Sequence, residues 1–340
     1  MIASGCVMKN SCYAPRPGCR ANDLAAGPGG AISDRATNDR PTPGSCMSDE
    51  IELKLALSSE GPALLIDHPL LQTLTSRMVS LGNQYYDTAD SALRSRRVAL
   101  RVRRQGEQRL QTLKSAAESH GGLSSRGEWE WSLDGVECNA AGLDVKGLRA
   151  LEHPALSGLA LETLHPVFTT DFERRLWRYR NDDCDIEIAL DQGGIHVGAA
   201  TLPICELELE LKRGDPACLW TLAEALCAPT GFADEALPAR PANHSKASRA
   251  SCLASGWPEP AAPGATSVDT LIDAIDIWQD SQDPAWLANA EAQCEQLVQR
   301  WTIDNDASCR EAGERILVNL RRGIVPWRSR DWLGLRQRAG

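Results

Sequence analysis

The sequence lacks the features of several common protein classes. No apolar run approaches the ~20 residues that a bilayer-spanning helix needs, and residues 1–20 contain no apolar core of a signal peptide. Lysine and arginine number 36 against 46 for aspartate and glutamate, which gives a formal net charge of −10. This charge argues against general affinity for duplex nucleic acid. We therefore expect no membrane and no nucleic-acid partner.

Short motifs for nucleotides, nucleophiles and zinc are missing as well. The 12 cysteines form no C-x-x-C pair, and the 6 histidines form no pair at zinc-finger spacing. This scatter favours a cytoplasmic protein with reduced thiols over a secreted disulfide framework. The sequence has no P-loop, G-x-G-x-x-G or G-x-S-x-G motif, so neither a nucleotide-binding fold nor a serine hydrolase is supported.

Composition divides the chain into four parts. Residues 1–46 are rich in Gly, Pro, Asn, Asp and Ser without any period, and we predict that they are a disordered leader. Either Met47 is the native start and the leader is an upstream artefact, or the leader is a genuine tail. We predict a strand-rich domain over 47–252, a Pro- and Gly-containing linker over 253–267, and a helical region over 268–340.

Within the strand-rich domain, charged and apolar residues alternate with the period of two that is typical of strands. Five segments show this pattern: 50–55, 98–103, 126–131, 186–191 and 206–211. Their charged faces are almost purely Glu, Asp, Arg and Lys, whereas the opposite faces carry Leu, Ile, Val and Trp. Two predicted helices interrupt the strands, one over 62–80 and one that begins at Asp215.

The charged faces need a physical explanation. An alternating charged face is often just the solvated side of a sheet. Here, however, carboxylates of one sign would crowd a single surface, which is unfavourable unless cations lie among them. We therefore predict an α+β protein whose antiparallel sheet closes into a barrel with the charges inward, around a polyanion and its divalent metal. Carboxylates are hard ligands for Mg²⁺ or Mn²⁺, and Arg and Lys neutralise phosphate oxygens.

Ordered motifs in these strands match a known family. Glu50-x-Glu52-x-Lys54 resembles the E-x-E-x-K signature of the CYTH, or triphosphate tunnel metalloenzyme, superfamily. Further matches follow in order: YYDTADSALRSRRVALRVRR at 85–104, Lys114, Arg126-x-Glu128-x-Glu130, and HSKASRA at 244–250. The resemblance covers about 47–250 and implies a closed, eight-stranded antiparallel tunnel with flanking helices.

Within this superfamily the chain most resembles the bacterial inorganic triphosphatases, in which the barrel is followed by a helical CHAD domain. Residues 268–340 are much shorter than a full CHAD domain, and all 6 histidines lie upstream of them. The helical region is therefore either a truncated or degenerate CHAD-like region or an unrelated appendage.

The resemblance, together with the face that each residue occupies, implies a set of site residues. Expected metal ligands are Glu50, Glu52, Glu128, Glu130, Asp191, Glu206 and Glu208, although Glu128 and Glu130 could instead bridge arginines. Expected phosphate-binding residues are Lys54, Arg101, Arg103, Lys114, Arg126, Arg174, Lys246 and Arg249. The expected catalytic residues are Glu50, Glu52, Lys54 and Glu208. We expect Arg94, Arg96, Arg97 and Arg104 on the surface.

The implied function is hydrolysis of inorganic triphosphate to pyrophosphate and phosphate with Mg²⁺ or Mn²⁺. Other activities of the superfamily stay open: a thiamine, nucleoside or RNA triphosphatase, or an adenylate cyclase. From other functional classes, a non-catalytic polyphosphate-binding module and a purely structural barrel are the alternatives. The expected partner is a small polyanion such as tripolyphosphate, and the sequence leaves the oligomeric state open.

Overall fold

The computed structural model describes residues 48–115, 118–229, 236–260 and 266–336, so the predicted leader lies outside the described residues. The strands are β1 Ser48–Leu57, β2 Ser76–Asp87, β3 Val98–Gln105, β4 Gln108–Ser115, β5 Glu118–His120, β6 Leu123–Ser132, β7 His165–Arg180, β8 Asp185–Val197, β9 Ala200–Arg213 and β10 Ala239–Pro241. The helices are α1 Gly61–Ile66, α2 Pro69–Gln72, α3 Ala92–Ser95, α4 Val145–Ala150, α5 Ala217–Cys227, α6 Lys246–Ser255, α7 Val268–Ser281, α8 Pro284–Ile303, α9 Ala307–Leu320 and α10 Ser329–Arg336.

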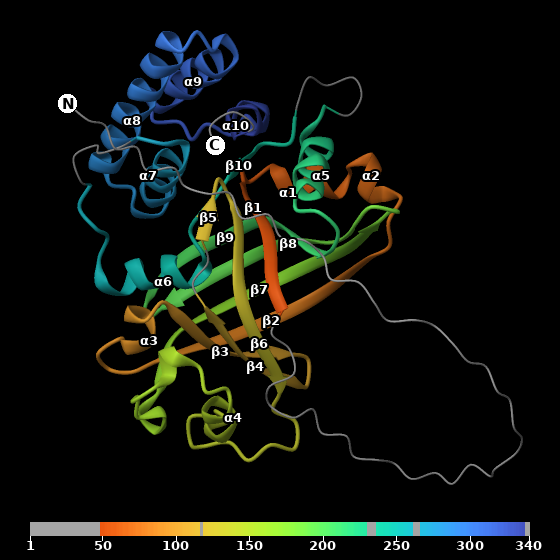
Figure 1. The fold of residues 1–340 in the computed structure, drawn as a ribbon, viewed down its shortest axis with the longest axis vertical. Helices are drawn as coiled ribbons and strands as arrows, with labels where there is room; N and C mark the ends of the chain where they lie inside the picture. The colour runs from red at the N-terminus through yellow and green to blue at the C-terminus, as the bar shows by residue number, and fades with distance from the viewer. Residues whose placement is uncertain (1–47, 116–117, 230–235, 261–265, 337–340) are drawn as a thin grey trace, which may run out of the picture. The chain divides into compact units, whose positions relative to one another are not determined.

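Eight strands close into a barrel. Neighbouring strands pair in the order β1-β9-β8-β7-β2-β3-β4-β6, and β6 then pairs with β1 through Ser48–Leu53, which closes the ring. Every pairing in the ring is antiparallel. The short strands β10 and β5 extend the sheet beside β1 and β6 (Figure 1). The predicted eight-stranded antiparallel tunnel is therefore confirmed.

The barrel separates the two faces of each strand. On β1, Glu50, Glu52 and Lys54 point into the barrel, whereas Leu53 and Leu55 join an outer apolar core. The same core contains the outward residues of β8 and β9 and the apolar sides of α1, α2 and α5 (Figure 1). A second core packs β3, β4 and β6 against α4 and the segments around it. These two cores lie outside the barrel. A further apolar cluster joins Leu81, Phe172, Ile195, Leu202 and Ile204 to Ala250 of α6, and Phe172 and Ala250 line the cavity beside the charges.

The structure corrects the helix predicted over 62–80. That segment forms two short helices, α1 and α2, and then enters β2 at Ser76. Pro69 has no N–H with which to continue α1, and it occupies the first turn of α2 instead. His68 caps this second helix, because its Nδ1 accepts a hydrogen bond of 3.2 Å from the N–H of Leu70. The helix predicted at Asp215 is α5.

The C-terminal helices α7–α10 share an apolar core of their own, and α10 also contacts α5 and β10. A capping box between Ser267 and Thr270 starts α7. The segment predicted as a linker over 253–267 begins inside α6, which ends at Ser255. Among the described residues, no helix is both long and apolar enough to span a membrane.

At the seam where β6 pairs with β1, a close backbone approach predicts a stability difference between two glycines. A Cβ at Gly122 would lie 2.5 Å from the carbonyl oxygen of Lys54, whereas a Cβ at Gly106 would meet no atom within 4 Å. Both glycines have positive φ, +88° and +61°. Gly106→Ala should therefore lower the free energy of unfolding by about 1 kcal/mol through the left-handed backbone alone. Gly122→Ala should cost clearly more in urea denaturation, and equal losses would contradict the seam geometry.

Candidate active site

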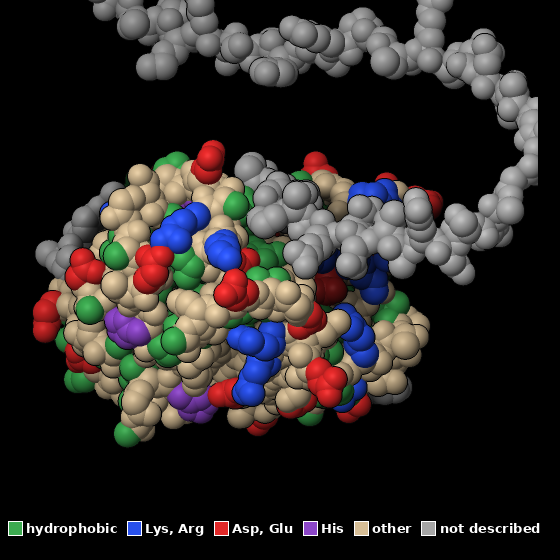
Figure 2. Space-filling model, turned by 90° about the horizontal axis from the view of Figure 1, so that it is seen from below, with side chains coloured by type: hydrophobic (Ala, Val, Ile, Leu, Met, Phe, Trp, Pro, Cys, Tyr) green, Lys and Arg blue, Asp and Glu red, His purple; other side chains and the backbone are tan. Residues whose placement is uncertain are grey.

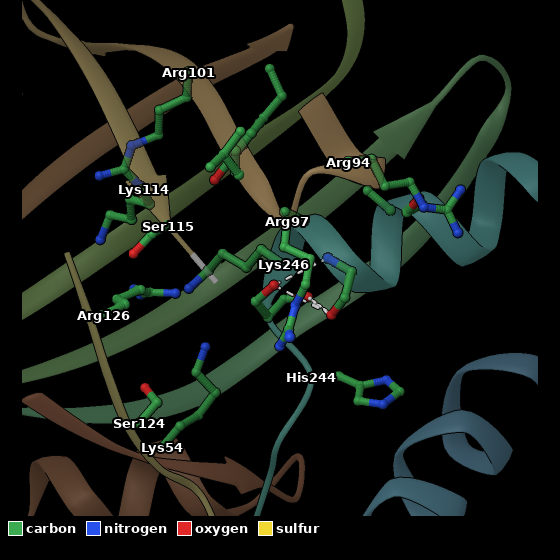
Figure 3. A pocket seen from close by; sticks show the side chains of 18 of the residues that line it. Lys54, Arg94, Arg97, Arg101, Lys114, Ser115, Ser124, Arg126, His244 and Lys246 are labelled. Carbon is green, nitrogen blue, oxygen red and sulfur yellow. Dashed lines mark hydrogen bonds between the residues drawn. The ribbon is translucent and has the colours of Figure 1, made fainter. Parts of the chain in front are cut away.

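A cavity of about 990 Å³ occupies the barrel interior, and many charged side chains line it. In Figure 3, Arg101, Lys114, Arg126 and Lys54 project from the strands, and Lys246 reaches toward them from α6. On the outer face shown in Figure 2, by contrast, basic and acidic side chains are interspersed without a large patch of either sign.

One group of charges, the Asp191 cluster, consists of Asp191, Glu206 and Glu208 with their basic partners. Asp191 on β8 pairs in register with Glu206 on β9, and oxygens of the three carboxylates lie within 4.8 Å of one another. The Lys246 ammonium donates to Asp191 at 2.8 Å, to Glu208 at 3.0 Å and also to Glu206. Arg174 donates two hydrogen bonds of 2.7 Å to Asp191, so the fork of the guanidinium matches the carboxylate.

These ion pairs decide the protonation of the cluster. Burial by itself would raise the pKa of Glu208, but Lys246, Lys54 and Arg174 hold that pKa well below its usual range. Burial would likewise lower the pKa of Lys246, yet Asp191, Glu206 and Glu208 raise it. Near neutral pH both residues are therefore charged, so Glu208 carries a lone pair that can accept a proton or bind a cation.

A second group, the Glu50 cluster, lies where β1 meets β6. Arg126 donates to Glu50 at 2.7 Å and to Glu52 at 2.9 Å, because its position on β6 faces Glu50 on β1. Lys114 donates to both oxygens of Glu50, at 2.8 and 2.7 Å, and lies 3.2 Å from Glu128. Desolvation would raise the pKa of Glu50, but the charges of Lys114 and Arg126 lower it well below its usual value.

The predicted alternatives for Glu128 and Glu130 can now be compared with their contacts. Arg101 lies 3.6 Å from Glu128 and 3.8 Å from Glu130, and the hydroxyl of Thr112 donates to Glu130 at 2.8 Å. Both carboxylates therefore make the arginine-bridging contacts that the sequence left open. A metal role for either remains a prediction.

Arg103 differs from the other inward-facing cations of the barrel. Its Nε donates to the side-chain oxygen of Asn83 at 2.9 Å, and it forms no ion pair within 4.0 Å among the described residues. Burial, followed by repulsion from Arg101 and Arg174, lowers its pKa to about 10. A guanidinium that is crowded by like charges and has no carboxylate partner retains N–H donors that could bind an anion.

Apart from Arg249, the predicted site contains cations and carboxylates in equal number. Seven cations, Lys54, Arg101, Arg103, Lys114, Arg126, Arg174 and Lys246, face seven carboxylates, Glu50, Glu52, Glu128, Glu130, Asp191, Glu206 and Glu208. The donor set fits Mg²⁺ or Mn²⁺, because every carboxylate oxygen is a hard ligand. One oxygen of Glu52 accepts from Arg126 and Ser124, while its second accepts no hydrogen bond from any described residue. Glu52 thus has a free ligand atom at the cavity.

The structure brings all of the predicted site residues together except Arg249. This residue does not line the cavity; it points from α6 to Asp280 on α7, with two hydrogen bonds of 2.7 Å. Residues three apart in a helix share nearly the same face, so Lys246 and Arg249 could both have pointed into the barrel. Lys246, the first residue of α6, does so and donates to Asp191, whereas Arg249 does not. The predicted phosphate-binding role of Arg249 is therefore wrong.

Two arginines predicted to lie on the surface are exposed, as predicted, but they also line the cavity. Arg94 and Arg97 belong to α3 and the turn that follows it, and their side chains border the opening beside α6 (Figure 3). Arg97 is a non-glycine residue with φ +59°, in the left-handed region. The strand period could not reveal them, because it does not extend through a turn. Their only signal was the density of arginine in 94–97.

Comparison with known proteins agrees with this geometry. Residues 48–237 match the model of the CYTH domain, which is more than half of the chain. The chain belongs to the CYTH family. A curated inorganic triphosphatase from Haemophilus influenzae is 36% identical over 184 residues, which are 53% of this chain and 50% of that protein. The chain thus spans about half the length of the curated relative that it matches.

Solved structures resemble the CYTH barrel at lower identity. A putative adenylyl cyclase from Hippeastrum, described as having a dominant triphosphatase activity, is 22% identical with a TM-score of 0.49. The match covers 60% of this chain and 96% of that one. A putative adenylate cyclase from Bacillus halodurans is 20% identical with a TM-score of 0.34, over 54% and 94% of the two chains. Both likenesses concern the fold alone.

The left-handed backbone at Arg97 predicts that this residue costs stability. Arg97→Gly should raise the free energy of unfolding by about 1 kcal/mol, because glycine adopts this conformation without strain. Arg97→Ala removes the same guanidinium but keeps the strain, so it should leave stability nearly unchanged. Thermal unfolding of the two variants beside the wild type measures the difference, and identical melting temperatures for both would refute the strain.

Proposed function

We propose that this CYTH protein hydrolyses inorganic triphosphate to pyrophosphate and phosphate inside the barrel. The observation that carries the proposal is Arg103, a cation without a carboxylate partner among the described residues, held beside Arg101 and Arg174. Such a position suits a phosphoryl group, since phosphate oxygens would replace the missing counter-charge. Membership in the CYTH family and the 36% identical triphosphatase support the same substrate class. We expect this activity in the cytoplasm.

In the proposed reaction, different residues of the cavity have different roles in phosphoryl transfer. Arg101, Arg103 and Arg174 would bind oxygens of the transferred phosphoryl group, and Lys114 and Arg126 would neutralise the pyrophosphate that leaves. Glu50, Glu52 and the carboxylates of the Asp191 cluster would hold a divalent metal, which supplies further charge neutralisation when bound. Lys54, 3.3 Å from Glu208, keeps that carboxylate charged.

The reaction balances without a covalent intermediate on the protein. A water oxygen attacks the terminal phosphorus in line, and the bond from that phosphorus to the bridging oxygen breaks. The water proton passes to a carboxylate, for which Glu50 and Glu208 are the candidates: both are ionised near neutral pH, and their lowered pKa values make each of them a weak base while its cationic partners stay in place. The electron pair of the broken bond stays with pyrophosphate.

A substrate panel tests the proposal against the other activities of the family. Phosphate release should be fastest from tripolyphosphate, compared with ATP and thiamine triphosphate, when each is supplied with Mg²⁺ or Mn²⁺. Faster release from ATP or thiamine triphosphate would show that this compound, and not tripolyphosphate, is the preferred substrate. The assignment of the fold and of the site would be unaffected. Binding of tripolyphosphate without phosphate release under any metal would favour a polyphosphate-binding module.

A pair of neighbouring arginines tests whether binding takes place inside the barrel. Arg103 faces the cavity, whereas Arg104 points to the opposite side of β3 and is exposed. Arg103→Ala should lower kcat/KM for tripolyphosphate by about two orders of magnitude, or ~3 kcal/mol, as expected for a lost transition-state contact. Arg104→Ala should change it less than about twofold. Equal, small effects in two folded variants would show that the reaction does not take place inside the barrel.

Metal dependence is tested on β1. Glu52→Gln keeps the shape of the side chain but removes the charge and weakens its free ligand atom, so phosphate release with Mg²⁺ should fall to the level of wild type in EDTA. Glu173→Gln is the matched control, because Glu173 is an exposed carboxylate on β7. Full activity of a folded Glu52→Gln variant, or of wild type in EDTA, would disprove the metal assignment.

A further inference from the structure

Helix α7, the first helix after the barrel, contacts the chain just before Lys246. Asp276 of α7 is 6% exposed, and its Oδ1 accepts a hydrogen bond of 2.5 Å from Arg240 on β10. Its Oδ2 accepts from the backbone N–H groups of Asn243 at 2.9 Å and His244 at 3.1 Å. A single buried carboxylate therefore fixes the backbone of the segment that leads into α6.

The same helix also contacts the chain just after Lys246. One turn further along α7, Asp280 receives two hydrogen bonds of 2.7 Å from the guanidinium of Arg249, in the second turn of α6. Arg249 also donates to the backbone oxygen of Pro203 on β9 at 2.8 Å. Arg249 thus ties α6 to both α7 and the barrel, which accounts for its absence from the cavity.

Lys246 lies between these two attachments. It is the first residue of α6, and Ser245 caps the helix by accepting from the N–H of Ser248. From this position its ammonium reaches all three carboxylates of the Asp191 cluster. A lysine has a long, flexible side chain, so its average position depends on where the backbone begins and on how firmly that backbone is held.

We propose that Asp276 and Asp280 are positioning residues that hold Lys246 in the Asp191 cluster, so that α7 forms part of the scaffold of the active site. The C-terminal helical region is then needed for the site to assemble and is not merely attached to the barrel. The catalytic consequence rests on the proposed function, whereas the positioning of Lys246 does not. The two can therefore be tested separately.

The test without activity measures the chemical reactivity of Lys246 in the full-length protein. Native protein is treated briefly with acetic anhydride, and acetylation of each lysine is read by peptide mass spectrometry. In wild type, Lys246 and Lys114 should be protected and the exposed Lys146 should be labelled. In Asp276→Asn and in Asp280→Asn, labelling of Lys246 should rise at least about fivefold while that of Lys114 stays constant.

A matched control separates positioning from general loosening. Asp331 of α10 is another buried carboxylate of the helical region and pairs with Arg315 at 2.8 Å. Asp331→Asn should leave labelling of Lys246 at the wild-type level. The proposal is overturned if Lys246 stays protected in folded Asp276→Asn and Asp280→Asn, or if Asp331→Asn exposes it equally. If Asp276→Asn fails to fold, Asp280→Asn alone tests the proposal, because Arg249 then still donates to Pro203 and the fold is less disturbed.

A second readout connects the position of Lys246 to the reaction. Asp276→Asn should lower kcat for tripolyphosphate, but the same change in a Lys246→Ala background should have no further effect, because the residue through which it acts is gone. Additive effects would overturn the proposed route through Lys246. If wild type releases no phosphate from tripolyphosphate, the proposed function fails, and the labelling result still decides the positioning of Lys246.

Discussion

The structure depends on the pairing of opposite charges on the inner face of a closed barrel. Carboxylates from β1, β6, β8 and β9 converge in one cavity, and they can remain ionised there only because lysines and arginines lie among them. On β1, β3, β8 and β9 the apolar residues that alternate with the charges pack in the outer cores, so the charged residues between them face inward. The ion pairs therefore follow from the closure of the sheet, and they also provide the chemistry of the site.

This arrangement holds the basic side chains in place without a ligand and restricts their conformational freedom. Lys114, Arg126, Arg174 and Lys246 are held by carboxylates, so their positions are set before a polyanion enters. Preorganised charges of this kind need little rearrangement during phosphoryl transfer. Arg103 is the exception, because Arg101 and Arg174 crowd it and no carboxylate of the described barrel lies within 4.0 Å of it; under the proposed function, an anion would supply the counter-charge.

Much of the barrel could be predicted from the sequence, because a period of two fixes which residues share a face of a strand. The inward positions of Glu50, Arg103 and Glu208 follow from that rule alone, given closure. The rule ends where the strands end. It could not place Arg97, in a left-handed turn, or Arg249, whose helix binds Asp280 from a distant part of the chain. The single helix predicted over 62–80 is wrong, because Pro69 cannot continue α1 and begins a second helix instead.

The central claim is that a cavity lined by both cations and carboxylates accepts a polyanion together with a divalent metal. Isothermal titration with imidotriphosphate, an analogue with nitrogen at the bridging positions, measures this binding without turnover. The account predicts a Kd at least about tenfold lower with Mg²⁺ than in EDTA, or ~1.4 kcal/mol, and a loss of that difference in Glu52→Gln. The same Kd for wild type with and without metal would contradict it.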